Sequence, residues 1–349
     1  MTSSTPLRRP SWQSRVVHSL VRARMRPHAF EPIDPVWVRL NMGRPRVARQ
    51  WMARSTGARS ALYPAAGRWK GGEHVWWPGK GDAPGGTTAD ESTPVLLYLH
   101  GGGFIACSPE THRPLVSSLV RRVEGEAFVP AYRLAPEHPH PAALHDVIGA
   151  YRHLVHERRV AASRIVIVGD SAGGGLALAL VMSLRDGGEP LPAGVVMFSP
   201  WTDLSGTSPS LEENSDRCAM FAGETIRRAS QFYLGGIDPT HPLVSPLFGD
   251  FGGLPPLLLH ASQDEVLRDD AVRVAERARE AGVDVTLRLW HHVPHVWQFF
   301  AAVLPEARES LTDAVAFVQS VTSARPTHTS CGGRTGGIGN TFEQQRPSA

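Results

Sequence analysis

The chain has 349 residues, of which 42% are hydrophobic and 20% charged, as in an ordinary globular protein that buries a sizeable core. Its formal net charge of +3 is unevenly spread, since residues 1–60 hold twelve arginines and two acids while the remainder holds 24 basic and 31 acidic residues. No compact basic run interleaved with aromatics marks a nucleic-acid site, and no apolar stretch approaches the roughly 20 residues of a membrane span. We expect no nucleic-acid partner and no stable membrane insertion. We favour docking of the basic segment on the acidic body of the chain, and the alternative is a basic arm that binds an anionic surface.

The cysteines and the N-terminus favour a cytoplasmic protein. Cys107, Cys218 and Cys331 are few, odd in number and far apart, which is typical of free thiols in a reducing compartment. The first residues include arginines but no apolar core of a signal peptide. The sequence leaves the oligomeric state open between a monomer and a homodimer.

Residues 1–60 are predicted to be a helical segment that lies outside the main domain. One apolar stripe at helical spacing comprises Trp12, Val16, Val17, Leu20 and Val21, and a second, shorter one comprises Val47, Trp51 and Met52.

From about residue 73 apolar strands alternate with longer helical patterns. The alternation predicts one α/β domain over residues 61–321, with a mostly parallel central sheet and helices on both faces. Residues 78–93 have the composition of a flexible loop, and residues 322–349, rich in Gly, Thr and Ser, are predicted to be a disordered tail. The expected strands are 74–77, 94–99, 127–130, 164–168, 194–199, 256–261 and 285–290, and the expected helices are 112–123, 142–157, 174–185, 223–234, 269–281 and 305–320.

A G-x-S-x-G string, Gly169-Asp170-Ser171-Ala172-Gly173, lies between an expected strand and an expected helix. This is the setting of a nucleophile elbow, a sharp turn that exposes the serine hydroxyl to an incoming carbonyl group. The alternative is a glycine-rich cap on a buried helix. Because a second motif supports the first, we predict Ser171 as a nucleophile.

The second motif, His100-Gly101-Gly102-Gly103-Phe104, directly follows the expected strand 94–99. Acyl transfer develops negative charge on the carbonyl oxygen, and preorganised backbone N–H groups stabilise that charge. We expect the amides of Gly102, Gly103 and Ala172 to form such an oxyanion hole.

A serine needs a base to take its proton, and the base needs an acid to orient it. His295 follows the last expected strand and is the predicted base, and Asp264, in the loop after strand 256–261, is the predicted acid. Glu265 is the alternative acid. Other candidates have simpler interpretations: Asp269 and Asp270 as helix N-terminal acids, His291 and His292 as loop or surface residues, and His260 as a core histidine.

The chain resembles the hormone-sensitive-lipase family of esterases, the bacterial group IV carboxylesterases, over roughly residues 73–320. Besides the two glycine motifs, Tyr132–Glu137, Ser199–Leu204, Gln263–Leu267 and His295–Trp297 look like family strings. Val296 and Trp297 depart from the His-Gly-Phe that family members often carry, which concerns the shape of the pocket. Arg133, Glu137 and Asp146 would satisfy one another near the catalytic loops.

The resemblance implies an α/β-hydrolase fold with a helical cap built from residues 1–60 and an insertion at about 205–240. It also implies a carboxylesterase, independent of cofactor and metal, that cleaves short- to medium-chain acyl esters through a Ser-His-Asp triad and an acyl-enzyme. A lactonase, an amide deacetylase or a thioesterase would use the same triad, and a small-molecule receptor on this fold is a remote alternative. Candidate residues for lining the acyl pocket, or for packing the cap, are Trp12, Trp37, Trp51, Met220, Phe221 and Phe232.

Overall fold

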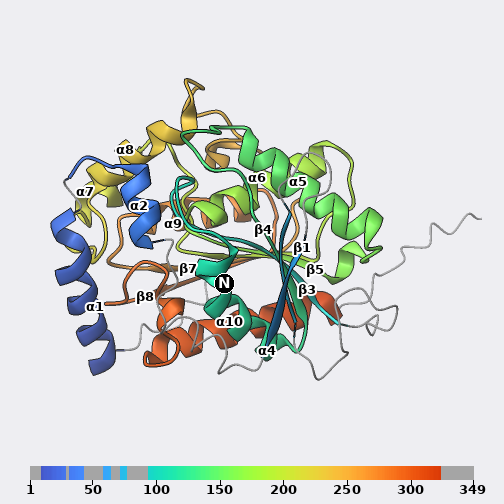
Figure 1. Ribbon diagram of the computed structural model, residues 1–349, viewed down its shortest axis with the longest axis horizontal. Coiled ribbons are helices and arrows are strands. Elements are labelled where there is room, and N and C mark those ends of the chain that lie inside the picture. The colour runs from blue at the N-terminus through green and yellow to red at the C-terminus, as the bar shows by residue number, and fades with distance from the viewer. Residues whose placement is uncertain (1–8, 29–30, 43–57, 64–70, 77–92, 324–349) are drawn as a thin grey trace, which may run out of the picture.

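The computed structural model describes residues 9–28, 31–42, 58–63, 71–76 and 93–323, and they surround one eight-stranded sheet (Figure 1). The strand order is β1-β2-β4-β3-β5-β6-β7-β8; β2 is antiparallel to both of its neighbours, and all other neighbouring pairs are parallel. The predicted mostly parallel sheet is thereby confirmed. The strands are β1 (Arg59–Tyr63), β2 (Gly72–Trp76), β3 (Val95–Leu99), β4 (Glu126–Pro130), β5 (Ile165–Asp170), β6 (Gly194–Phe198), β7 (Leu257–Ser262) and β8 (Val285–Trp290).

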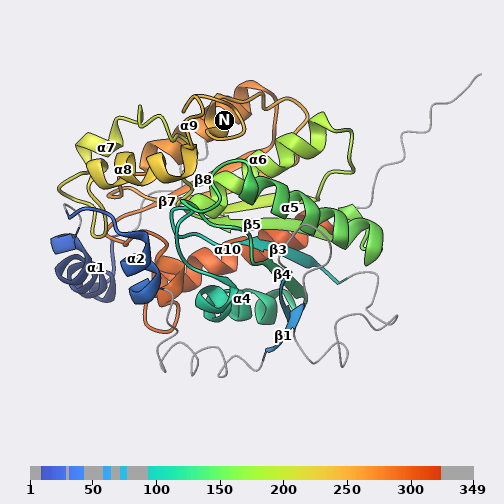
Figure 2. The ribbon, with the colours of Figure 1, turned by 45° about the horizontal axis from the view of Figure 1, so that its top comes forward.

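Helices cover both faces of the sheet (Figure 2). Helices α4 (Pro109–Val123) and α10 (Pro305–Ser323) pack on one face, and α5 (Ala142–Arg152), α6 (Ala172–Asp186) and α9 (Arg268–Glu280) pack on the other. The six helices predicted between and after the strands are confirmed, including α8 (Gly223–Leu234). Shorter helices are α7 (Ser210–Glu213), η3 (His153–Glu157), η4 (Ala162–Arg164), η5 (Pro246–Phe248) and η6 (Trp297–Phe300).

The strands are apolar on both sides because each side faces a separate core. Along β3, Val95, Leu97 and Leu99 enter the core beneath α5, α6 and α9, and Leu96 and Tyr98 enter the core beneath α4 and α10. This two-sided burial is typical of parallel sheets and explains the continuous apolar runs in the sequence.

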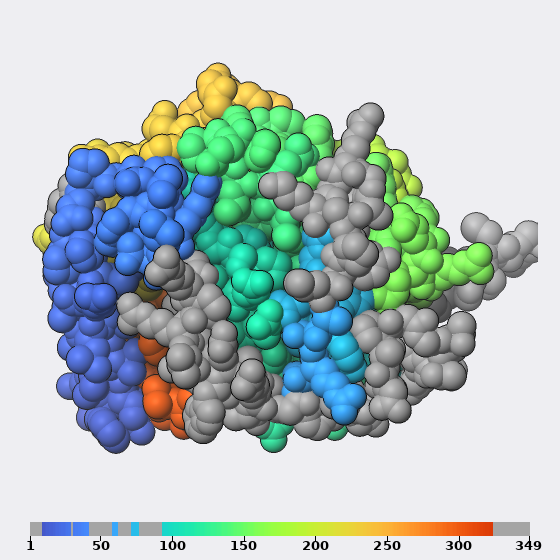
Figure 3. All heavy atoms as spheres, in the orientation of Figure 1, coloured from blue at the N-terminus to red at the C-terminus, as the bar shows by residue number. Residues whose placement is uncertain are grey.

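The N-terminal residues form α1 (Trp12–Met25), η1 (Arg26–His28) and α2 (Pro35–Met42) at one corner of the molecule (Figure 3). The helical prediction is confirmed for this part, but β1 was not expected. The apolar stripe predicted on α1 is mostly exposed, since Trp12 and Leu20 are 71% and 65% exposed; Val17 packs against the body, and the fully buried residue of the helix is Ser14. The second apolar stripe, the predicted loop at 78–93 and the predicted tail beyond residue 323 lie outside the described residues, Thr93 excepted.

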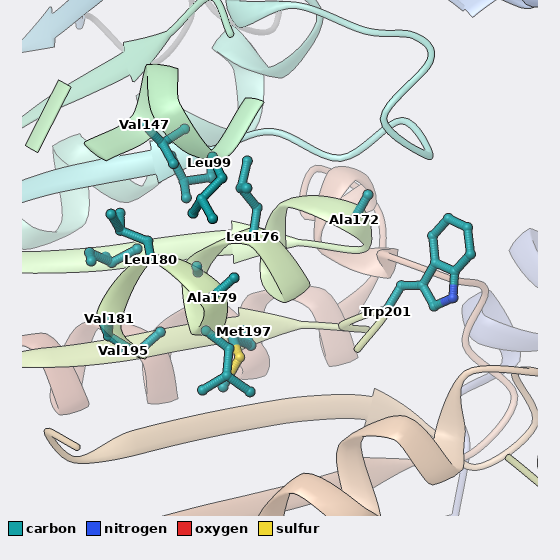
Figure 4. Packing of buried hydrophobic residues seen from close by; sticks show 14 of the residues in the cluster. Leu99, Val147, Ala172, Leu176, Ala179, Leu180, Val181, Val195, Met197 and Trp201 are labelled. Carbon is teal, nitrogen blue, oxygen red and sulfur yellow. The ribbon is translucent and has the colours of Figure 1, made fainter. Parts of the chain in front are cut away.

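Helix α6 is buried on almost every side. The surrounding contacts therefore hold its first residue, Ala172, in place. Leu176 and Leu180 lie toward the sheet near Leu99, and Ala172, at the N-terminal end, lies near Trp201 (Figure 4). Packing on this scale holds the turn before α6 rigidly against the sheet.

The strand order places two loops side by side. From β3 the chain continues to β4 on one side and β5 is added on the other, so the direction of winding reverses at β3. At such a switch point the loops after two adjacent parallel strands diverge and leave a crevice at their carboxyl ends. The loops here are the glycine triplet after β3 and the Ser171 turn after β5.

Candidate active site

Ser171 occupies a strained backbone conformation between β5 and α6, with φ 53° and ψ −123°. A non-glycine residue in such a region costs of order 1–3 kcal/mol, which the surrounding packing must supply. The Ser171 N–H donates to Phe198 O and its carbonyl accepts from Trp201 N, each at 2.9 Å. These contacts agree with the elbow predicted from the sequence.

The glycines flanking the turn are needed for close packing. A Cβ on Gly169 would lie 2.3 Å from Gly173 O, and one on Gly173 would lie 2.0 Å from Leu99 O. No side chain fits at such distances, so strand, helix and the end of β3 approach only because both positions are glycine.

The loop after β3 folds into a tight turn around Gly102, whose φ is +116°. Its carbonyl oxygen accepts from Ile105 N at 3.1 Å and from Ala106 N at 3.0 Å. Within the described residues, the N–H groups of Gly102, Gly103 and Ala172 have no hydrogen-bond acceptor. Unpaired amides at a turn are available to an oxyanion.

Asp170 links the two loops and was not singled out from the sequence. Its buried carboxylate accepts hydrogen bonds from Tyr98 Oη at 2.8 Å and Gly101 N at 3.1 Å, and lies 3.2 Å from His112 Nε2. Burial by itself would raise the pKa of Asp170, but the charge of His112 and the hydrogen bonds from His112 and Tyr98 outweigh it and lower that pKa. An ionised Asp170 thus ties the glycine loop to the Ser171 turn. The signal available in the sequence was a carboxylate at the end of an otherwise apolar strand.

His295 pairs with Glu265, and not with the predicted Asp264. Its Nδ1 lies 2.6 Å from Glu265 Oε2, and both side chains are buried. The other carboxylate oxygen of Glu265 accepts from Ser262 N at 2.6 Å, so each of its two oxygens has a partner that holds the carboxylate in place. The alternative acid named from the sequence is therefore the one that the geometry favours.

Asp264 faces a different set of partners. One oxygen accepts from His292 N at 2.8 Å, and the other forms an ion pair with Arg217. Burial raises its pKa, but the His292 hydrogen bond and the Arg217 charge more than compensate, so the pKa of Asp264 is lowered. The prediction of Asp264 as the acid of His295 is wrong because the turn after Ser262 directs the buried Asp264 toward Arg217 and His292 N, and brings Glu265 to His295.

The end of β6 lies between the serine and histidine turns. Phe198 O holds Ser171 N, while the next side chain, Ser199 Oγ, accepts from Val296 N at 3.2 Å. Val296 has a left-handed φ of 50°, the conformation that a glycine adopts freely and that the family's usual sequence supplies. The ring of Phe221, from the insertion, lies edge-on to His295 with centroids 5.3 Å apart.

The remaining acid candidates serve the structure around the site. Asp269 and Asp270 lie in the first turn of α9, as predicted. The N-cap of α9 is Leu267. Asp269 accepts from Ser210 N at 2.9 Å, and the buried Asp270 accepts from Thr202 N and Asp203 N at 2.7 and 2.8 Å. Both carboxylates hold the segment after β6 and the start of α7.

The other histidine candidates also have structural surroundings. His260 is fully buried, with Nδ1 2.8 Å from Ser310 Oγ, as expected for a core histidine, although its Nε2 has no partner among the described residues. His291 and His292 lie in the turn after β8, partly and largely exposed respectively, as predicted.

In the string Tyr132–Glu137, one of the two expected ion-pair partners differs. Arg133 pairs with Asp146 at 2.8 Å, as predicted, but Glu137 pairs with Arg39 of α2 at 2.6 Å. The hydrogen bond from Arg39 lowers the pKa of Glu137 to about 2. Arg39 also donates to Ile105 O at 2.7 Å, so the N-terminal segment holds the loop of the glycine triplet.

Of the candidate pocket residues, Phe221 contacts His295, and Met220 and Phe232 are partly buried. Trp12 and Trp37 are 71% and 46% exposed, and Trp51 lies outside the described residues. In the part of the chain that is described, no three His, Cys, Asp or Glu side chains are grouped to hold a metal, and no helix is long and apolar enough to cross a bilayer.

Comparison with known proteins shows the family of the chain. A family model described as the alpha/beta hydrolase fold matches residues 96–299. The chain is 43% identical to an acetyl-hydrolase of Streptomyces hygroscopicus over 228 residues, 65% of this chain and 76% of that protein. It is 34% identical to the carboxylesterase/phospholipase LipF of Mycobacterium tuberculosis over 282 residues, 73% of this chain and 75% of that one.

Solved structures give the same result over a longer span. An esterase from the bacterial hormone-sensitive lipase family superposes with a TM-score of 0.76 at 35% identity, covering 90% of this chain and all of that one. A hormone-sensitive lipase from a metagenome library gives a TM-score of 0.78 at 32% identity, covering 89% and 98%. The chain belongs to the α/β-hydrolase family, in the group that resembles hormone-sensitive lipase.

Proposed function

We propose that this protein is a carboxylesterase that cleaves short- to medium-chain acyl esters through an acyl-enzyme on Ser171, with His295 as base and Glu265 as its orienting acid. The chain is an ester-hydrolysing enzyme by its family, whose members reported above are named esterase, carboxylesterase or acetyl-hydrolase. The observation that carries the residue assignment is the buried 2.6 Å contact between His295 and Glu265 beside the strained Ser171 turn.

In the proposed reaction, Ser171 Oγ attacks the ester carbonyl while His295 Nε2 takes its proton. Glu265 accepts from Nδ1, which selects the tautomer that leaves Nε2 free and stabilises the imidazolium that forms. The amides of Gly102, Gly103 and Ala172 stabilise the oxyanion. His295 returns the proton to the leaving alcohol, and water then attacks the acyl-enzyme, with His295 acting again as base and acid.

Aromatic rings around the glycine loop support the preference for shorter acyl chains. Phe104 stacks on Tyr233 with centroids 3.7 Å apart and lies 6.0 Å from Trp201, and Phe221 abuts His295. Rates on aryl esters of increasing acyl length, with one lactone, one anilide and one thioester, test this part. A higher rate on one of the last three than on every ester would favour the lactonase, amide deacetylase or thioesterase alternative.

We further propose that residues 1–60 and about 205–240 form the cap over this site, with residues 61–321 as the catalytic domain and residues 322–349 as a tail. Arg22 of α1 donates to Cys218 O at 3.1 Å. This contact between the N-terminal segment and the insertion supports a cap built from both. The cysteine usage of the sequence remains the reason to propose a cytoplasmic location.

Ser171→Ala tests the nucleophile. We expect ester turnover to fall by several orders of magnitude, because only binding and the oxyanion hole remain, while the melting temperature stays within a few degrees. An organophosphonate should label the wild-type protein once, on the peptide that contains Ser171. Ser183→Ala, in the same helix, is the matched control and should keep both activity and labelling. Labelling of another peptide, or substantial turnover by Ser171→Ala, would show that the nucleophile is elsewhere.

A further inference from the structure

Helix α1 docks on the protein through its polar side. Ser14 is fully buried and its hydroxyl donates to His292 O, while Ser11, the N-cap, donates from N and Oγ to Glu306 at 2.7 and 3.0 Å. Val17 also packs, partly buried, against the cluster around Trp297, but Trp12, Val16 and Leu20 do not. An amphipathic helix on a globular protein ordinarily buries most of its apolar side, and α1 leaves most of its own exposed.

Most of the apolar side of α1 is consequently left at the surface, and α2 contributes a second such face. Seven large hydrophobic side chains are exposed in the described part of the chain, and six belong to these two helices, which lie at one corner of the molecule (Figures 1 and 2). A ring contact of 5.4 Å between His28 and Trp37 connects the end of η1 with α2. The exposed side chains are Trp12, Val16 and Leu20 of α1, at spacings of four, and Val36, Trp37 and Leu40 of α2; we call these six the apolar corner.

The charges on α1 and η1 have one sign, whereas Asp34, which accepts from Val36 N and Trp37 N, and Glu31 precede α2. Residues 12–28 include Arg15, Arg22, Arg24 and Arg26 and no acid. Arg15 and Arg24 are exposed, and neither side chain has a hydrogen-bond partner within the described residues. Apolar groups that include tryptophan, flanked by arginines, are the composition of helices that lie in the interface of an anionic bilayer.

Charge also argues against other occupants. A second copy placed face to face would bring two arginine-rich helices together, which is unfavourable. The surrounding charge is complementary to an anionic lipid surface.

We propose that the apolar corner is a docking surface for anionic phospholipid bilayers, with Trp12 and Leu20 entering the interfacial region and Arg15 and Arg24 contacting lipid phosphates. The docked helix contacts the turn that carries His295, since Ser14 bonds His292 O and the rings of His18 and His292 lie 5.9 Å apart. Resting on the esterase proposed above, this surface would direct the site toward acyl esters held in or on a membrane.

Vesicle co-sedimentation of the full chain tests the proposal, carried out in the Ser171→Ala background so that binding is measured without hydrolysis. Phosphatidylcholine vesicles with about 30% phosphatidylglycerol are compared with pure phosphatidylcholine, at about 0.1 M and 0.5 M NaCl. We expect the partition coefficient on anionic vesicles to be at least about tenfold higher at low salt, and the difference to vanish at high salt.

Two paired variants separate the two contributions. Trp12→Gln/Leu20→Gln should lower the partition coefficient on anionic vesicles by about tenfold or more. Arg15→Gln/Arg24→Gln should lower the partition coefficient on anionic vesicles by a similar factor and leave that on neutral vesicles unchanged. Arg159→Gln/Arg279→Gln removes two exposed arginines from other surfaces and should change nothing. Circular dichroism melting checks the fold of each variant.

Absence of salt-sensitive binding to anionic vesicles would overturn the proposal, as would equal losses in the control pair. So would sedimentation of the wild type as a dimer that Trp12→Gln/Leu20→Gln converts to a monomer, since a second copy would then cover the apolar corner. Because binding is read without catalysis, failure of the lipid proposal and failure of the esterase proposal give different results.

Discussion

Glu265 and Asp264 are adjacent carboxylates with different surroundings, and the difference comes from one turn. Ser262 and Glu265 form an S-x-x-E pattern in which the glutamate reaches back to the serine N–H, a geometry known from helix capping boxes. This pattern was the sequence signal that could have identified Glu265. Asp264 is one residue earlier and one methylene shorter, so its carboxylate reaches Arg217 and His292 N instead.

Glu265→Gln and Asp264→Asn form a matched pair at the residue scale. Glu265→Gln should lower turnover by about three to four orders of magnitude, because the amide can hold His295 in the wrong tautomer and cannot stabilise the imidazolium. Asp264→Asn should keep turnover within about tenfold of wild type, since its partners are Arg217 and a backbone N–H. Turnover numbers on a soluble aryl ester, with folding checked by circular dichroism, decide the matter. A collapse confined to Asp264→Asn would restore the original assignment.

At the scale of elements, the side chain of Arg39 connects α2 to the oxyanion loop. Arg39 donates to Ile105 O at 2.7 Å and to Ala135 O at 2.6 Å, and contacts both carboxylate oxygens of Glu137. Ile105 in turn donates its N–H to Gly102 O, at the turn that presents the proposed oxyanion donors. The ion pair is partly exposed and adds little stability, so the main consequence of this contact is the position of the loop.

Arg39→Gln should therefore affect catalysis more than stability. We expect kcat to fall by about tenfold, since a displaced donor weakens stabilisation of the transition state, with KM nearly unchanged. Arg39→Lys should restore only part of the rate, because an ammonium cannot reproduce the planar fork of donors.

Arg227→Gln is the matched control for Arg39→Gln, since Arg227 forms a 2.6 Å ion pair with Glu212 away from the glycine loop. It should leave kcat unchanged. If Arg39→Gln lowered the melting temperature while kcat stayed at the wild-type value, the side chain would have only a structural role.

For the whole molecule, three buried histidines predict acid sensitivity. Burial lowers the pKa of His74, His100 and His260 to about 3 in each case. In the unfolded chain the pKa is about 6.5, so between pH 6.5 and 3 the unfolded state binds more protons than the folded state. The contribution of each histidine to the free energy of unfolding should accordingly fall as the pH is lowered through this window, by about 2 kcal/mol at pH 5.

Denaturant unfolding at about pH 7.5 and pH 5 measures this loss. His260→Gln should reduce the difference between the two pH values by about 2 kcal/mol, because an amide does not titrate. His145→Gln, at an exposed histidine, should leave the difference unchanged. The comparison of variants is needed because burial raises the pKa of Asp270 to about 7, which acts in the opposite direction over the same pH window. A pH difference that is the same in His260→Gln as in the wild type would contradict the argument.

Local patterns in the sequence determined the alternating strands and helices, the Ser171 turn, the glycine loop and the position of His295, because hydrophobic period and turn chemistry depend on neighbours in the chain. Three features were decided by tertiary structure. The acid depended on side-chain direction in a turn, and the partner of Glu137 is Arg39, 98 residues away. The side of α1 that faces outward depends on tertiary contacts. Hydrogen bonds from Ser11 to Glu306 and from Ser14 to His292 O fix the rotation of the helix about its axis, and they outweigh the preference to bury its apolar side chains.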